Sequence, residues 1–259
     1  MQEIDKLFLA KLADKKDAVN KKHTLEVTDF LDEYQLAVAH KWFSTQHWDR
    51  VYFTGGNEHA ERQIAILYPE KLESTVQEHP NNIIDTLVSV IRIQLPKDVE
   101  PYTHKQYLGA LMKLGVKREK IGDISIHKQG ADILIKKEIE TYLYNALPQL
   151  TRFSKSIIQI VGVEELQWEE PETICTIHVV ASLRLDACIA EMAGCSRSKA
   201  IQIIEEQRVW VNGELQSKRT RELKEQDKIT IRGKGRFRLT AIQGVTKKGN
   251  MMIEIEKNK

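Results

Sequence analysis

The stretch SRSKAIQIIEEQRVWVNGE, residues Ser196–Glu214, changes its pattern of apolar residues half-way along. Ala200 and Ile204 recur at the spacing of one helix face, whereas Val209 and Val211 follow the alternating spacing of a strand. The Asn-Gly pair that follows is typical of a tight two-residue hairpin turn. The stretch therefore predicts a helix, a short strand and a turn in immediate succession.

The start of this helix is basic. Ser196 is a suitable N-cap, and Arg197 and Lys199 fall in the first turn. Cations there oppose the helix dipole, which favours anions at that end. Free backbone N–H groups together with two cations form a good binding corner for a phosphate group. We therefore expect Arg197 and Lys199, together with Arg208 beyond the helix, to reach outward to phosphates.

Charge is distributed unevenly along the chain. Residues 181–259 contain 17 Lys and Arg against 10 Asp and Glu, a net charge of +7, whereas residues 1–180 have a net charge of −5. Such asymmetry favours a polyanionic partner for the last third of the chain, most often a nucleic acid. A solvated basic face is the alternative that charge alone leaves open.

Composition argues against several classes of protein. The chain has 259 residues, no apolar run of about 18 residues and no signal-peptide pattern at its N-terminus. We therefore expect a cytosolic protein without a membrane segment. Its three cysteines share no CxxC spacing, its eight histidines show no HxH or HExxH spacing, and Gly55-Gly56 lacks a nucleotide-binding pattern. We expect no metal, no cofactor and no catalytic residue.

The chain as a whole predicts an α+β architecture in three parts. Residues 1–48 show helical spacing and are expected to form an N-terminal helical region. Residues 49–180 alternate strands with two helices, which fits a ferredoxin-like or RRM-like middle domain whose sheet is open on one side. A polar loop is expected around Pro80 within it. Residues 181–259 form the third part.

The third part resembles the S4-type (alpha-L) RNA-binding module, in which two short helices and a small twisted sheet grip structured RNA. One departure is Gln207, because many such modules carry glycine there. The resemblance spans Ser182–Gly233, and the matching positions are Arg184-Leu185-Asp186, Ser196-Arg197, Ala200, Val209, Val211-Asn212-Gly213 and Asp227-Lys228-Ile229.

Further stretches extend the resemblance to nearly the full chain. FTGGNEHAERQIAILYPE (Phe53–Glu70), QYLGALMKLGVKREKIGDISIHKQGADILI (Gln106–Ile135) and the basic run RGKGRFR (Arg232–Arg238) resemble the YlmH family of bacterial proteins. The glycine replaced by Gln207 is missing from that branch as well. The resemblance implies binding to 23S rRNA of the large (50S) ribosomal subunit and contact with a trapped peptidyl-tRNA, in ribosome-associated quality control. We expect a monomeric factor that is not an enzyme.

The candidate RNA-binding residues come from both parts of the argument. In the third part they are Arg184, Ser196, Arg197, Ser198, Lys199, Arg208, Lys218, Arg219, Arg232, Lys234 and Arg236. In the middle domain a second basic cluster contains Lys117, Arg118 and Lys120, after a helix that ends at Gly115. A solvated turn is an equally weighted interpretation of that second cluster.

Three alternatives stay open. Arg184-Leu185-Asp186 also occurs in the active-site motif of pseudouridine synthases, where the aspartate is the nucleophile, so an RNA-modifying enzyme is one alternative. The amphipathic helix that follows in this chain favours a structural aspartate instead. A ribosome assembly factor or translational regulator would use the same RNA contacts. Trp210 is expected to pack in the core, with stacking on a base as the second interpretation.

Overall fold

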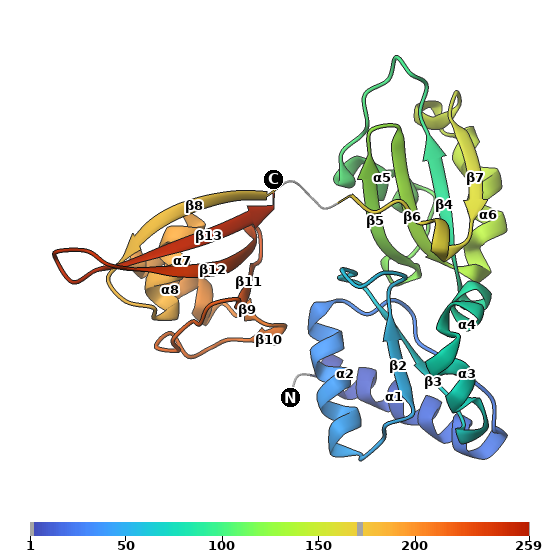
Figure 1. The fold of residues 1–259 in the computed structure, drawn as a ribbon, viewed down its shortest axis with the longest axis horizontal. Coiled ribbons are helices and arrows are strands. Elements are labelled where there is room, and N and C mark those ends of the chain that lie inside the picture. Colours follow the sequence, from blue (N-terminus) through green and yellow to red (C-terminus); the bar gives the residue numbers. More distant parts are fainter. Residues whose placement is uncertain (1–2, 170–172, 259) are drawn as a thin grey trace. The chain divides into compact units, whose positions relative to one another are not determined.

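The computed structural model describes residues 3–169 and 173–258, which divide into two units between residues 169 and 170 (Figure 1). The expected boundary at residue 180 is wrong, because the strand β8 (Thr173–Val180) pairs along its whole length with the C-terminal strand β13 (Met251–Asn258). The expected extension of the middle domain through residues 170–172 lies outside the described residues. None of the helices in the described ranges has the length and apolarity needed to cross a membrane.

The first unit begins with two helices on a small sheet. Helices α1 (Glu3–Lys22) and α2 (Glu33–Thr45) confirm the helical spacing. The strands pair in the antiparallel order β1-β3-β2, with bounds Glu26–Val27, Val51–Thr54 and Ile64–Leu67 for β1, β2 and β3. Strands β2 and β3 were expected in the middle domain, but they join β1 because β3 is buried on both faces, with Leu67 packed beside α1 and α2.

The ferredoxin-like prediction is confirmed in the second half of this unit. Four strands and two helices follow the order βαββαβ, and the antiparallel sheet has the strand order β5-β6-β4-β7. These elements are β4 (Val88–Gln94), α5 (His104–Lys113), β5 (Ile121–His127), β6 (Gly130–Lys136), α6 (Glu140–Ala146) and β7 (Ile157–Val161).

Two short helices, α3 (Glu73–Glu78) and α4 (Pro80–Leu87), connect the two sheets. The polar loop expected around Pro80 is wrong, because proline is well suited to a first helical position and Ile84 of α4 is buried in the core shared by both sheets.

The helix-free face of the ferredoxin-like sheet is covered, which corrects the expectation of an open sheet. Val90 and Leu134 pack in one core with residues of the N-terminal sheet. Beyond them the segment Leu166–Glu169 crosses the strands, and the backbone N–H of Gln167 donates to the buried carboxylate of Asp132 at 2.8 Å. The RRM mode of binding, which stacks bases on exposed aromatic residues of the central strands, therefore has no platform on β4 and β6.

A glycine-rich loop after β2 is anchored to the ferredoxin-like sheet by Asp123. This side chain is 8% exposed and accepts hydrogen bonds from the backbone N–H groups of Glu61 (2.6 Å) and Arg62 (3.4 Å). Gly55 lies so close to the returning chain that a Cβ would come within 2.3 Å of the Arg62 carbonyl oxygen. Burial raises the pKa of Asp123 to about 6, against the opposing effect of Arg62 and Arg118.

We expect Asp123→Asn to stabilise the first unit at pH 7.5 by up to about 3 kcal/mol, and less at pH 5. A carboxyl whose folded pKa is raised stabilises the fold below its unfolded pKa near 4, and this contribution is lost as the pH rises through about 6. The neutral amide keeps an oxygen acceptor and does not titrate. Urea denaturation followed by tryptophan fluorescence at both pH values measures the difference, and an effect independent of pH would contradict it.

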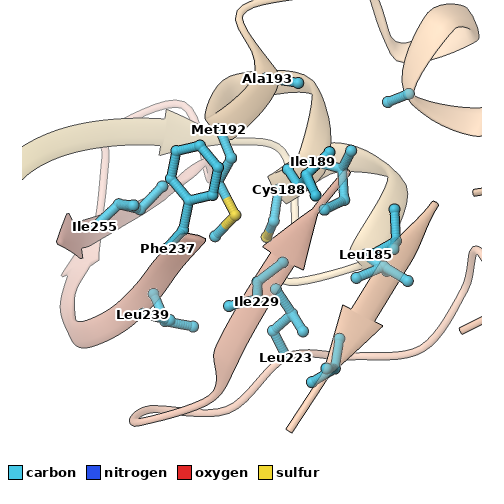
Figure 2. Close-up of a cluster of buried hydrophobic side chains, with 14 of the residues drawn as sticks. Leu185, Cys188, Ile189, Met192, Ala193, Leu223, Ile229, Phe237, Leu239 and Ile255 are labelled. Atoms are coloured by element: carbon cyan, nitrogen blue, oxygen red, sulfur yellow. The ribbon is translucent and has the colours of Figure 1, made fainter. Parts of the chain in front are cut away.

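The second unit is a six-stranded antiparallel sheet with α7 (Leu185–Ala193) and α8 (Arg197–Glu205) against one face. The strand order is β10-β9-β11-β12-β13-β8. Figure 2 shows the core between helices and sheet, where Leu185 and Ile189 of α7 face Ile229 and Phe237 of the strands. The remaining bounds are β9 (Val209–Val211), β10 (Glu214–Leu215), β11 (Lys228–Ile231) and β12 (Gly235–Val245). Strands β12 and β13 extend the sheet beyond the sequence prediction.

Candidate nucleic-acid interface

The start of α8 has the predicted local geometry. Ser196 has extended backbone angles, and its hydroxyl accepts a hydrogen bond from the backbone N–H of Lys199 at 3.3 Å. The side chains of Arg197, Ser198 and Lys199 lie in the first turn, in residues that are all exposed. The Lys199 ammonium bonds only to the Gln202 side chain, at 2.9 Å, among the contacts of the described residues. This helix start therefore presents both backbone donors and cations.

Asp186 joins the starts of the two helices. Its carboxylate accepts hydrogen bonds from Nε and Nη2 of Arg184, at 3.2 and 2.9 Å, and from Nη2 of Arg197, at 3.1 Å to each oxygen. The aspartate is 2% exposed, whereas the side chains of Arg184 and Arg197 are 35% and 48% exposed. One buried anion thus orients two half-exposed guanidinium groups.

Ionised Asp186 is the favoured form in the fold. Burial by itself would raise the pKa of Asp186, but hydrogen bonds from Arg184 and Arg197 outweigh burial and hold that pKa below its ordinary value. The structural role expected for Asp186 agrees with this geometry. A nucleophile must reach its substrate, and this carboxylate is enclosed and doubly paired.

The loop between β10 and β11 brings further cations to the same place. The N–H of Asp186 donates to the carbonyl oxygen of Arg219 at 3.1 Å, and that of Leu185 donates to Arg221 at 2.7 Å. Lys218 and Arg219 are exposed on this loop. We call the resulting group the Asp186 corner, and its members are Arg184, Asp186, Ser196, Arg197, Ser198, Lys199, Lys218 and Arg219.

The other predicted cations of this unit lie at the opposite end of α8, about 13 Å away for a nine-residue helix. Arg208 donates from Nη2 to the carbonyl oxygen of Arg232 at 2.8 Å and pairs with Glu206 at 3.0 Å. Exposed Lys234 and Arg236 follow Arg232 in the turn between β11 and β12 and the start of β12. The structure therefore separates the predicted residues into the Asp186 corner and a basic hairpin tip.

The middle-domain cluster is mostly engaged within the chain. Arg118 donates from Nη1 to the carbonyl oxygens of Ile121 (2.6 Å) and Gly122 (3.2 Å), and burial lowers its pKa to about 10. Lys120 pairs with Asp29 and Glu138, both at 2.6 Å. Only Lys117 of the three is exposed. The geometry favours a structural role for Arg118 and Lys120 and leaves Lys117 as the residue that an RNA would meet.

Comparison with known proteins agrees with this geometry. Residues 84–165 match the putative RNA-binding domain in YlmH, and residues 183–229 match the S4 domain. A relative from Bacillus subtilis (strain 168), ribosome-associated protein quality control protein P2, is 29% identical over 98% of this chain and 96% of its own length. Together these matches support the YlmH family for this chain.

A solved structure also resembles this chain. The cell division protein ylmH from Streptococcus pneumoniae aligns with a TM-score of 0.47 and 16% identity, covering 64% of this chain and 97% of that one.

Gln207 adopts the backbone conformation that glycine would favour, with φ of +56°. Its N–H donates to Ile204 (3.0 Å) and the next N–H, of Arg208, donates to Ile203 (3.2 Å), which closes α8 in a Schellman arrangement. The turn is therefore kept without the glycine, at the cost of a strained side-chain-bearing residue.

We expect Gln207→Gly to stabilise the C-terminal unit by about 1 kcal/mol, because glycine removes the strain of the left-handed conformation. Gln202→Gly in the middle of α8 is the matched control and should destabilise by a similar amount. Hydrogen exchange of the amides in β9 and β11 of the full chain reports this stability. If both variants changed the stability of the C-terminal unit in the same direction, the explanation by backbone strain at Gln207 would be refuted.

The Asn-Gly hairpin prediction is confirmed. Asn212 and Gly213 both have positive φ, at +53° and +77°, as a type I′ turn requires. The Asn212 side chain donates to Asp227 at 2.8 Å and accepts from the backbone N–H of Lys228 at 2.9 Å. These bonds fix the turn to the start of β11.

Some exposed cations of the C-terminal unit are absent from the residues predicted from the sequence. Lys228 and Arg238 lie opposite each other on β11 and β12, outside the core. The alternation of basic and apolar residues in KITI and RFRL was the signal that could have found them.

Proposed function

We propose that this protein is a cytoplasmic RNA-binding factor that associates with the ribosome in quality control of stalled translation. The Asp186 corner carries the proposal, because it combines a helix start with several exposed cations around one buried carboxylate. The name of the Bacillus subtilis relative, which matches nearly the whole chain, supports the ribosome as the source of the RNA.

The finer proposal is that the Asp186 corner docks on 23S rRNA of the large subunit as a monomer. Phosphate contacts there would set position, since guanidinium and ammonium groups bind the backbone whatever the base. The first unit would then approach an obstructing peptidyl-tRNA, with Lys117 as its exposed basic residue.

A binding role is favoured over catalysis. The enclosed, doubly paired Asp186 is a poor nucleophile, which weakens the pseudouridine synthase alternative. Mass analysis of rRNA from cells that lack the protein separates the two functions. A missing modification would favour the enzyme, and unchanged rRNA would support the binding factor.

Sedimentation with purified subunits tests the docking. We expect the protein to co-migrate with 50S subunits, more strongly when they carry peptidyl-tRNA, and to dissociate as salt rises. Isolated 30S subunits are the control. Failure to co-migrate with 50S subunits even at low salt would overturn the proposal.

A further inference from the structure

Trp210 lies on the helix-free face of the C-terminal sheet, which corrects the expectation of a core residue. Its neighbours in β9, Val209 and Val211, are fully buried in the core beneath α7 and α8. Successive side chains of a strand point to opposite faces, so the half-buried indole of Trp210 faces away from the helices.

On that face Trp210 has the apolar Leu215 of β10 on one side and polar and basic residues on the other. Trp210 lies opposite Thr230 of β11, and Thr230 lies opposite Arg236 of β12. Two residues further along β11, on the same face, Lys228 lies opposite Arg238. Adjacent strands are about 5 Å apart, so the long cationic side chains of β11 and β12 are able to extend toward the indole ring of Trp210.

Charge on this part of the face is positive. Lys228, Arg236 and Arg238 lie there. The next strand, β13, contributes two acidic residues to this face: Glu256, whose carboxylate is 3.6 Å from Nε of Arg238, and Glu254, which accepts a hydrogen bond from the Thr240 hydroxyl at 2.9 Å. The basic hairpin tip at Arg232 adjoins the same strands. An aromatic ring beside cations is the combination that binds unpaired nucleotides, since the ring stacks on a base and the cations bind phosphates.

We propose that the helix-free face of β9, β11 and β12 binds single-stranded RNA, with Trp210 stacking on a base and Lys228 and Arg236 beside the phosphates. This surface is separate from the Asp186 corner, which is built from the starts of α7 and α8 and the loop after β10. The unpaired strand is the ligand whatever RNA supplies it, so the inference goes beyond docking on the ribosome.

Fluorescence anisotropy with 5′-labelled rA12 and the full chain tests the proposal. We expect Trp210→Ala to weaken binding about ten- to a hundredfold, and Trp210→Phe to stay within about threefold of the natural protein because it keeps a stacking ring. Lys228→Glu should weaken binding and lower the salt slope by about 0.7, the value for one phosphate contact on a single strand. A 12-base-pair RNA duplex should compete poorly.

Equal affinity of Trp210→Ala and the natural protein for rA12 would overturn the proposal, as would duplex competing as well as rA12. Trp210→Phe and Lys228→Glu decide the matter if Trp210→Ala fails to fold by circular dichroism. Lys199→Glu combined with Lys218→Glu is the matched control, which should keep rA12 binding while losing 50S subunits. Failure of the ribosome proposal would leave rA12 binding intact, so the two failures are distinguishable.

Discussion

Replacing Arg197 and Lys199 together by glutamate is expected to weaken binding to 50S subunits at least about a hundredfold and to flatten its salt dependence. Each phosphate contact releases counterions, with a slope of about −0.9 per contact on duplex DNA. Loss of two contacts at the start of α8 should therefore lower the magnitude of the slope by between one and two. Sedimentation or anisotropy across a salt series measures both quantities.

The matched control for net charge is Lys247→Glu with Lys248→Glu. These lysines are exposed in the turn between β12 and β13 and belong to neither helix start. Equal weakening by both double variants would mean that net charge, and not the Asp186 corner, governs binding. A glutamate at 197 would also face Asp186, so Lys199→Glu with Lys218→Glu provides a test that leaves the arginine pair intact.

Asp186→Asn is expected to lower RNA affinity about tenfold although it removes a negative charge from a basic surface. Simple electrostatics predicts the opposite sign, because one carboxylate fewer raises the positive potential. A positioning role for Asp186 predicts lower RNA affinity, because the amide cannot hold both Arg184 and Arg197 by charge-assisted hydrogen bonds. About tenfold corresponds to one such bond, near 1.4 kcal/mol.

Glu205→Gln is the control for this test, since it removes an exposed carboxylate of α8 outside the corner. It should leave affinity unchanged or raise it slightly. Higher affinity for Asp186→Asn would refute the positioning role.

The stability of the C-terminal unit in acid provides an independent test of the role of Asp186. A carboxyl with a lowered folded pKa stabilises the fold above its unfolded pKa near 4, and that stability is lost as the pH falls through the folded pKa. The natural protein should lose melting temperature in its C-terminal unit below about pH 4, and Asp186→Asn should lack this component. Scanning calorimetry at pH 3 and pH 6 measures it.

Much of the candidate site was readable from sequence because its signals are local. Ser196 as N-cap, the cations of the next turn and the Asn-Gly turn each depend on residues a few positions apart. The bridging of Arg184 and Arg197 by one carboxylate was not readable, because the residues are on two helices and meet only after packing. The spacing of the basic residues likewise did not indicate that Lys120 forms an ion pair with Asp29 whereas Lys117 is exposed.

The sequence by itself determined most of the helices and strands and indicated the family, since periodicity, caps and turn residues act over short distances. It did not predict α4, β12 or β13. Only the tertiary structure decided which strands pair, so that β8 joins β13 and β3 joins β1. The alternation of residues in a strand distinguishes its two faces but does not indicate what covers each face. Packing between residues that are far apart in the sequence decides that. For this reason the middle sheet is closed by Leu166–Glu169, while Trp210 faces away from its core.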